Sequence, residues 1–353
     1  MRLGLNLRYL GSLGAGAAPA SSLRYVREAE RLGFAVAWTA EVFSSDAVSL
    51  LGWLAGQTTR ISLGTAVMQI PARTPAMTAM TAATLDLLSG GRFRLGLGVS
   101  GPQVSEGWHG ARFDRPLTRI REYVDVVRMA LRREEVAYAG EHYRLPLPDG
   151  PGKALRLGNR PLRTDIPIYL AAVGPRSVEL AGEIADGWLS VFFHPEFGGE
   201  HMVRLRAGRQ KRGLDLAGFD VVAAVPVVLG DDPERCADRV RMYTAHYLGG
   251  MGTRSQNFYN GLIDRMGYHD AARTVQELYL DGKPLAAAHA VPRELLEQTA
   301  LLGSVARIAD GLRAYAEAGV TTLSAMVFPE DDDDAIGTLR ALAEAYEKSG
   351  VCE

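Results

Sequence analysis

The sequence predicts an α/β fold, a TIM (β/α)8 barrel, and three observations lead to this prediction. Short apolar segments with strand character alternate with amphipathic segments, an alternation that is typical of parallel strands. Eight such units can be counted in the 353 residues, which is the arithmetic of this barrel. The long irregular stretches follow strands, where barrels build their active sites. A doubly wound sheet is the alternative, but the GxGxxG dinucleotide fingerprint is missing from the first turn.

The predicted strands are short apolar segments that end in polar, small or glycine-containing turns. They cover residues 3–7, 35–39, 61–67, 93–99, 168–172, 187–192, 220–229 and 322–327.

Helices are predicted between the strands from apolar spacing and from end signals. Ser21 and Ser22 are placed to cap the first helix, which Gly33 ends. Pro75, directly after Thr74, opens another helix that runs to residue 88. Further helices are predicted at residues 46–57, 117–132, 271–280 and 292–302.

Three irregular insertions interrupt this alternation, at about residues 101–115, 137–164 and 249–270. The first contains Gly, Pro, His and Trp, and the second is rich in Pro and Gly. Stretches of this length are often functional excursions. Because no linker separates two parts of the chain, we expect one domain over residues 1–353, with its insertions in strand-to-helix loops.

The composition excludes several classes of function. With 47% hydrophobic and 23% charged residues and a formal charge of -2, the chain lacks the basicity that nucleic acid binding requires. Cys236 and Cys352 lie far apart, without CxxC or His-rich spacing, so no metal site is expected and a reducing cytoplasm is the simplest compartment. We also expect no signal peptide and no membrane span.

Two glycine-containing turns follow predicted strands and are candidate ligand contacts. The first contains Ser100, Gly101, Gln103 and Val104, whose amides and side chains suit a phosphate or an oxygen-rich ring edge. The second, residues 173–177, places an arginine beside the free N–H groups of a helix start, an arrangement that suits an anion. Turns that serve chain geometry alone are the alternative for both.

Three further places carry potential chemistry, two of them at strand ends and one in the first insertion. Ala66 and Val67, within a small-residue strand end, would let a flat ring approach the backbone, although an ordinary buried strand end has the same composition. Glu41 ends the second strand and is a candidate general acid or base, or a hydrogen-bond acceptor for a neighbouring loop. His109 lies beside Trp108 between glycines, in a segment able to move over a site or in a plain surface loop.

These positions lie in segments that resemble the bacterial luciferase-like superfamily of flavin and deazaflavin oxidoreductases. The segments are ISLGTAVMQIPARTPAMTAMTAATLDLLSGGRFRLGLGVSGPQVSEGWHG and IPIYLAAVGPRSVELAGEIADGWL, followed by GLIDRMGY and AGVTTL. Together they are most similar to the deazaflavin-dependent branch that includes methylene-tetrahydromethanopterin reductase. No GxSxG, HExxH or Walker sequence points to another chemistry.

The resemblance implies a luciferase-like TIM barrel, usually a homodimer, with coenzyme F420 at the carboxyl-terminal mouth and FMN as the alternative cofactor. It implies a non-prolyl cis peptide at Ala66-Val67, behind the central face of the deazaflavin ring. The residues that it places against the cofactor are Asn6, Thr39, Ala66, Val67, Ser100, Gly101, Gln103, Val104, Val173, Gly174, Pro175, Arg176 and Ser177.

The resemblance also bears on the reaction. Sugar-phosphate dehydrogenases of the superfamily carry a histidine and a glutamate where this chain has Val42 and Gly101. Reduction is therefore preferred: hydride transfer to a C=C or C=N bond of a small molecule or of a dehydroamino acid in a lanthipeptide precursor. The alternatives are an FMN-dependent monooxygenase and a catalytically silent cofactor-binding protein. Glu41 and His109 are the candidate proton donors. The substrate side is expected to contain Phe43, Met68, Trp108, Tyr247, Asn257 and Tyr259.

Overall fold

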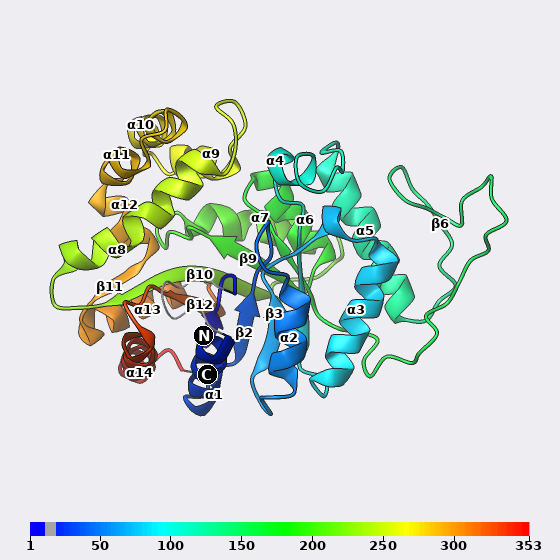
Figure 1. The fold of residues 1–353 in the computed structure, drawn as a ribbon, viewed down its shortest axis with the longest axis horizontal. Coiled ribbons are helices and arrows are strands. Elements are labelled where there is room, and N and C mark those ends of the chain that lie inside the picture. The colour runs from blue at the N-terminus through cyan, green and yellow to red at the C-terminus, as the bar shows by residue number, and fades with distance from the viewer. Residues whose placement is uncertain (11–18, 353) are drawn as a thin grey trace.

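The computed structural model describes residues 1–10 and 19–352, and within them eight parallel strands close into a barrel (Figure 1). The first strand pairs with the last, Leu3 opposite Leu323, which closes the ring. All eight predicted strands and the predicted TIM barrel are confirmed. In their order around the barrel the strands are β1 (Arg2–Asn6), β2 (Val36–Thr39), β3 (Ser62–Thr65), β5 (Phe93–Gly98), β8 (Ile168–Ala171), β9 (Gly187–Val191), β10 (Asp220–Leu229) and β12 (Thr322–Val327).

Helices surround the barrel, and their local sequence explains where most of them begin. Asp46 accepts a hydrogen bond from the Ser49 amide at 2.7 Å and caps α2. Thr74 caps α3 in the same way. The predicted capping by Ser21 is wrong, because α1 begins at Pro19 and the Ser21 hydroxyl instead donates to Asp332. The outer helices are α1 (Pro19–Arg31), α2 (Ala47–Ala55), α3 (Pro75–Leu88), α5 (Pro116–Leu131), α6 (Pro175–Ile184), α7 (Gly198–Gln210), α8 (Pro233–Ala245), α13 (Val305–Glu317) and α14 (Asp332–Ser349).

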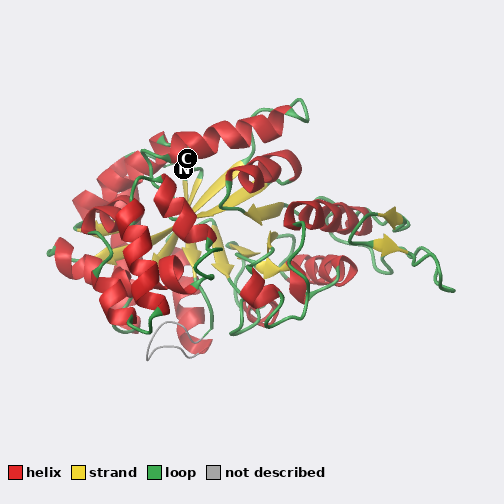
Figure 2. Cartoon of the chain, turned by 90° about the horizontal axis from the view of Figure 1, so that it is seen from above, coloured by secondary structure: helices red, strands yellow, loops and turns green. Residues whose placement is uncertain are grey.

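The first two insertions differ in how they relate to the barrel. The first forms the short helix α4 (Pro102–Ser105) and a loop that returns to α5. The second forms a small hairpin of β6 (Tyr138–Ala139) and β7 (Arg144–Leu145) in an arm that extends away from the body (Figures 1 and 2). Of these two, only the first insertion lies at the carboxyl ends of the strands. The second stands between α5 and β8, in a helix-to-strand connection and not in the strand-to-helix loop that was expected.

The third insertion continues α8 and builds a helical layer beside the mouth of the barrel. It begins in a π-helix (His246–Gly250) and contains α9 (Phe258–Arg265), and the layer continues beyond the insertion with α10 (His269–Leu280), α11 (Pro284–His289) and α12 (Arg293–Thr299). The predicted helix at residues 292–302 is too long. It ends at Thr299, and β11 (Leu301–Gly303) pairs with the end of β10, so backbone pairing outweighs the local helical pattern.

The base of the barrel is filled by a buried ionic cluster around Asp220. Its carboxylate accepts from Tyr169 at 3.0 Å and Thr322 at 2.8 Å, and forms ion pairs with Arg2 at 3.0 Å and Arg94 at 3.2 Å. Each donor belongs to β1, β5, β8 or β12, so the cluster joins strands from several sides of the barrel. A buried carboxylate needs such partners because water no longer solvates it.

The ladder between β3 and β5 is interrupted. Pairing stops at Gly64 and resumes at β4 (Met68–Gln69), which pairs with β5 from Leu97 onward. In the gap, the Thr65 hydroxyl donates to the Gly96 carbonyl at 2.7 Å and accepts from the Gly96 amide at 2.9 Å. One side chain thus takes the place of two backbone ladder bonds, and the chain beyond Thr65 is free to bulge into the barrel.

Glycine is required at residue 96 for this arrangement. A Cβ atom there would lie 1.9 Å from the Thr65 carbonyl oxygen and 2.8 Å from a Leu189 methyl group. The distance to the carbonyl oxygen cannot be accommodated without moving the backbone of the bulge, whereas the Leu189 side chain could shift.

We predict that Gly96→Ala lowers the free energy of unfolding by about 3 kcal/mol, because the added methyl group overpacks the barrel interior. Gly337→Ala is the matched control, since Gly337 lies within α14 with open space around it. The control should raise stability by about 0.5–1 kcal/mol through helix propensity. Urea unfolding followed by circular dichroism measures both, and equal effects of the two substitutions would contradict the packing argument.

Candidate active site

The carboxyl ends of the strands open at the upper end of the barrel in Figure 1, where α4 and α9 stand. The turns after β2, β4, β5 and β8 meet there, as expected for a parallel barrel. Phe113 of the first insertion packs on Phe258 of α9, with 6.1 Å between ring centroids. The first and third insertions therefore meet at the rim of the mouth.

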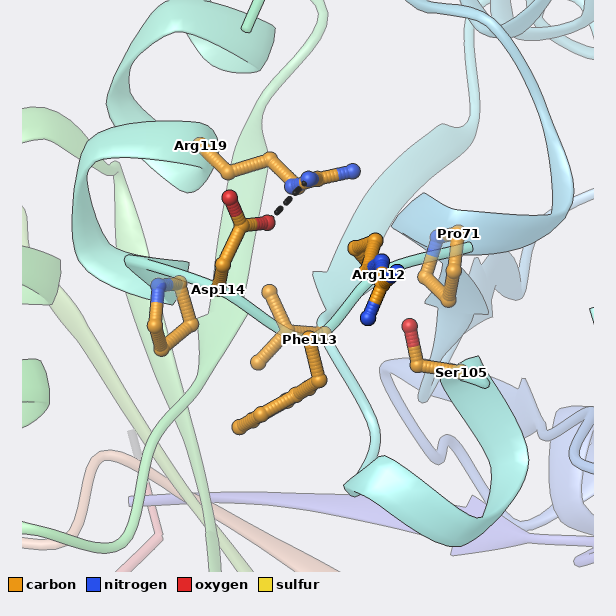
Figure 3. Close-up of a pocket in the computed structure, with 8 residues that line it drawn as sticks. Pro71, Ser105, Arg112, Phe113, Asp114 and Arg119 are labelled. Atoms are coloured by element: carbon orange, nitrogen blue, oxygen red, sulfur yellow. Dashed lines mark hydrogen bonds and ion pairs between the residues drawn. The ribbon is translucent and has the colours of Figure 1, made fainter. Parts of the chain in front are cut away.

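A small cavity lies between the first insertion and the segments that follow β4 and β5 (Figure 3). It is lined by Pro71, Ser105, Arg112 and Phe113, with the Asp114–Arg119 ion pair at 2.7 Å along its edge. The hydroxyl of Ser105 donates to the Ala111 carbonyl at 2.7 Å and holds the loop around this cavity.

The bulge after β3 presents Ala66 and Val67 at the mouth. The peptide bond between them is cis, so this expectation is confirmed. Both residues are partly exposed, and Ala66 packs against the interior cluster that contains Trp38. The Ala66 amide donates to the Thr39 carbonyl at 2.7 Å, and this bond ties the bulge to β2. Their small side chains leave room for a flat ring on the exposed side.

Glu41 lies in a dense set of hydrogen-bond donors. Its carboxylate accepts from the amides of Ala47 and Gln69, both at 3.1 Å, and forms a bidentate ion pair with Arg73. The residue is 6% exposed. Four donors occupy the two oxygens, so the carboxylate acts as an acceptor that joins the turns after β2 and β4. This geometry supports a positioning role for Glu41 and leaves it poorly placed to donate a proton.

His109 has the opposite character. Its Nε2 atom is buried and has no hydrogen-bond partner among the described residues. The backbone amide donates to the Val104 carbonyl at 3.1 Å, which fixes the loop but leaves the ring free. A buried ring nitrogen without a partner is costly, so its place suits a group that arrives with a ligand.

Gln69 and Arg73 are site residues that the sequence prediction missed. The Gln69 Nε2 atom donates to the Val42 carbonyl at 2.6 Å, whereas its buried Oε1 atom has no partner among the described residues. Arg73 supplies the charge that compensates Glu41. The segment QIPAR follows the small-residue strand directly, and polar residues just after a barrel strand end were the available signal.

The two predicted glycine turns both lie at the mouth. Ser100 has a left-handed backbone with φ of 60°, and Gly101 precedes α4. Gly174 precedes α6, and its carbonyl accepts from the Ser177 hydroxyl at 2.8 Å. The first N–H groups of α6 have no side-chain cap, and Arg176 beside them is exposed. A helix start with free N–H groups beside an arginine is an arrangement that suits an anion.

Asn6 and Thr39, expected at the cofactor, use their polar atoms within the protein. The Arg8 amide donates to Asn6 Oδ1 at 2.9 Å, and the Thr39 hydroxyl donates to the Arg8 carbonyl at 3.0 Å. Thr39 is completely buried and Asn6 is 7% exposed. Both side chains therefore hold the backbone of Arg8.

Aromatic rings form one wall of the mouth. Tyr247 lies 4.8 Å from both Tyr243 and Tyr259 and 5.5 Å from Phe192, measured between ring centroids. Tyr243 contacts Phe328 at 5.4 Å. Burial raises the pKa of Tyr259 to about 12, so its phenol is protonated at neutral pH. Tyr247 and Tyr259, predicted on the substrate side, belong to this wall.

Asn257 positions this wall rather than facing it. Its Nδ2 atom donates to the carbonyls of Tyr247 and Leu248 at 3.1 and 2.9 Å, where the π-helix leaves carbonyls available. Its Oδ1 atom accepts from the amides of Tyr259 and Asn260, both at 3.0 Å, and caps α9. The side chain thus joins the π-helix to α9.

The other predicted substrate-side residues are placed differently. Met68 is completely buried in the main core, with the Thr78 hydroxyl 3.8 Å from its sulfur, which leaves no surface for a ligand. Its expected place at the substrate is therefore corrected. Phe43 and Trp108 are 57% and 66% exposed, on the loops after β2 and β5.

The described part of the chain contains no candidate metal cluster and no helix that could span a membrane. No group of three or more His, Cys, Asp or Glu residues there could hold a metal ion. His201 is buried among Trp188, Phe193 and Phe197, and this burial lowers its pKa to about 4. Among residues 1–10 and 19–352 there is no helix with the length and hydropathy to span a bilayer.

Comparisons with known proteins give consistent similarities. The model of the family described as luciferase-like monooxygenase matches residues 1–322. A putative coenzyme F420-dependent oxidoreductase of Mycobacterium tuberculosis is 43% identical over 330 residues, 92% of this chain and 94% of that protein. The 5,10-methylenetetrahydromethanopterin reductase of Archaeoglobus fulgidus is 29% identical over 307 residues, 85% and 87% of the two chains. The solved coenzyme F420-dependent tetrahydromethanopterin reductase from Methanopyrus kandleri has the same fold, with a TM-score of 0.79 at 24% identity over 96% and 97% of the chains.

We predict that Glu41→Gln lowers the free energy of unfolding by about 3 kcal/mol, because Arg73 then loses the carboxylate that compensates it in a largely buried site. The NH2 group of the glutamine side chain would also face one of the N–H groups that now donate to a Glu41 oxygen, and that N–H group would lose its acceptor. Chemical denaturation measures the change. Glu277→Gln, at an exposed position of α10, is the control and should leave the midpoint unchanged. Equal midpoints for the two variants would refute the positioning role.

Proposed function

Since the chain belongs to the luciferase-like monooxygenase family, we propose that it is a coenzyme F420-dependent reductase that transfers a hydride to a C=C or C=N bond of a small molecule. The observation that carries the proposal is the Ala66-Val67 bulge at the mouth, in a chain that is 43% identical over 92% of its length to a protein named as a putative coenzyme F420-dependent oxidoreductase. The names of both curated relatives support the oxidoreductase class, and the cofactor is supported by the names of two relatives that include F420.

The residues at the mouth fit the cofactor. The partly exposed Ala66 and Val67 would support the flat ring, and the uncapped start of α6 with Arg176 would hold the phosphate. The turn with Ser100 and Gly101 would contact the region between them. When bound, the reduced deazaflavin supplies a hydride, that is, two electrons at once. The protein supplies orientation and the proton that completes the reduction.

His109 is the group that we propose to donate this proton. Its unpartnered Nε2 atom lies in the loop that rims the mouth, with Gly107 and Gly110 on either side. Gly110 has φ of 66°, a conformation that glycine adopts without strain. Glu41, the other predicted donor, is engaged with Arg73 and is assigned a positioning role.

A small-molecule substrate is favoured over a modified peptide. The contact between Phe113 and Phe258 joins the first and third insertions across the rim, whereas an extended peptide would need an open groove there. Dehydroamino acid reduction in a lanthipeptide precursor remains the alternative that the substrate assay below includes.

We predict that purified protein binds F420 in preference to FMN, and that His109→Ala slows single-turnover oxidation of bound F420H2 by an enone at least about 100-fold. The F420 dissociation constant should not change, because the ring acts on the substrate. Fluorescence titration and stopped-flow absorbance measure the two quantities. His289→Ala, at an exposed position, is the matched control.

Three outcomes would count against parts of this proposal. Tighter binding of FMN with rapid oxygen consumption would indicate the monooxygenase alternative. Bound F420 without turnover of enone, imine or dehydroamino-peptide substrates would indicate a catalytically silent protein. An unchanged rate in His109→Ala would remove the histidine as proton donor.

We further propose a homodimer formed through α2 and α3. Trp53 of α2 is 38% exposed, and α3 exposes Met77 and Met80 at 51%, Leu87 at 58% and Leu88 at 56%. The four α3 residues recur at helical spacing and so form one apolar stripe. A contiguous exposed apolar surface of this kind is typical of an interface.

For the wild-type protein we predict a solution mass twice the chain mass of 38.1 kDa, and a monomer for the double variant Met80→Glu/Leu87→Glu. Two charges per protomer would be buried in the interface without partners. Light scattering coupled to size exclusion measures the mass. Leu285→Glu, on α11 and 70% exposed, is the control that should remain dimeric. A monomeric wild type would rule out this interface.

We also propose the reducing cytoplasm as the compartment of this enzyme. Cys236 is buried, Cys352 is exposed, and both are free thiols. Free thiols are the usual state of cysteine under reducing conditions.

A further inference from the structure

Arg8 occupies an unusual backbone position at the mouth. It follows β1 with φ of 57°, in the left-handed region that side chains other than glycine seldom adopt. Its amide donates to Asn6 Oδ1 at 2.9 Å, while its carbonyl accepts from the Thr39 hydroxyl at 3.0 Å and the Ala40 amide at 2.8 Å. Three hydrogen bonds therefore fix the backbone of Arg8 and, with it, the direction in which the side chain leaves the barrel.

The guanidinium group packs on aromatic rings. Its central carbon lies 5.4 Å from the centre of the Tyr243 ring and 5.1 Å from that of the Phe328 ring. Such cation–π contacts use the flat faces of the guanidinium and leave the N–H groups at its edge available. The side chain is half-buried, so these groups can be reached from the mouth.

The charge of Arg8 has no carboxylate partner among residues 1–10 and 19–352. The segment between these ranges, GSLGAGAA, contains no acidic residue. The neighbouring arginines differ in this respect, because Arg73 pairs with Glu41 and Arg239 pairs with Asp334 at 2.6 Å. Within the described residues, Arg8 is thus a fixed cation beside the aromatic wall without a carboxylate partner.

The titratable groups that face Arg8 do not neutralise it. Burial, and then the charge of Arg8, lower the pKa of His246, so its imidazole is neutral at neutral pH. The nearby phenols of Tyr9, Tyr243 and Tyr247 have pKa values raised chiefly by burial, so they carry no negative charge. An anion that enters the mouth would meet Arg8 as an unpaired charge.

We propose that Arg8 is a specificity-determining residue that binds an anionic oxygen group of the substrate, a carboxylate or a phosphate monoester. The proposal rests on the reductase function proposed above. A guanidinium edge matches both groups through two parallel hydrogen bonds. The substrate class is therefore an unsaturated compound that carries such a group, with its apolar part against Tyr247 and Tyr259.

The barrel topology places the proposed site for the substrate's anionic group away from the proposed site for the cofactor phosphate. The anion-binding start of α6 follows β8, whereas Arg8 follows β1. Around the closed barrel, β8 is the fourth strand from β1 in either direction, so the two cations stand on opposite sides of the mouth. An F420 phosphate held at Arg176 would leave Arg8 to the substrate.

The test measures binding by isothermal titration to the F420-loaded protein, with cinnamate, phenyl phosphate and the uncharged cinnamamide as probes. In Arg8→Gln we expect the dissociation constant of the better anion to rise about 10- to 100-fold, the range for losing hydrogen bonds to a charged group. The affinities for cinnamamide and for F420 should stay unchanged. Arg8→Lys should bind the anion with intermediate affinity, since it keeps the charge without the planar fork.

The control variant is Arg206→Gln, an exposed arginine on α7, which should behave as wild type. Tighter binding of cinnamate to wild type would identify the substrate's anionic group as a carboxylate, and tighter binding of phenyl phosphate would identify it as a phosphate monoester. The proposal is overturned if wild type binds neither anion more tightly than cinnamamide. It is also overturned if Arg8→Gln retains anion affinity or loses F420 affinity. Failure of every variant to bind F420 would instead refute the proposed function, and the same titrations on cofactor-free protein would still test Arg8.

Discussion

The replacement of backbone pairing by the Thr65 hydroxyl is the interaction on which the mouth of this barrel depends. A regular ladder between β3 and β5 would keep residues 66 and 67 in the wall. Because Thr65 satisfies both polar groups of Gly96, the bulge forms without leaving a buried donor or acceptor unpaired. Gly96 contributes the space, since no side chain fits between the carbonyl of Thr65 and β9.

The polar and charged side chains at the mouth fall into two groups. Some have every hydrogen-bonding group satisfied within the protein, and others keep a group that is available to a ligand. Glu41 and Arg73 are satisfied by each other and by backbone amides, so they join the turns that carry the bulge. Arg8, His109 and Gln69 each retain a group that the described residues do not satisfy. Buried or half-buried polar groups of this kind are costly in the free protein and gain partners when a ligand enters.

Much of the fold and part of the site could be predicted. Each barrel strand is an apolar run closed by a turn signal, so local sequence was sufficient for all eight. Residues 301 and 302 were predicted as the end of a helix, because the pairing of β11 with β10 involves residues far away in the chain. Met68 was expected to contact a ligand, but its side chain is completely buried. The direction of a side chain at a strand end depends on the pairing register, and the break at residues 65–67 changes that register before Met68 pairs with Leu97.

The sequence by itself determined the barrel, the family resemblance and the turns that meet at the mouth, because these follow from periodicity and from short motifs. Only the tertiary structure decided which polar groups are already paired. Glu41 and Arg73 are separated by 32 positions and Arg8 and Phe328 by far more of the chain, so no local pattern reports their contacts. Whether a polar group has a partner depends on distances in space. These distances divide the candidate site residues into those that hold the site together and those that are available to a ligand.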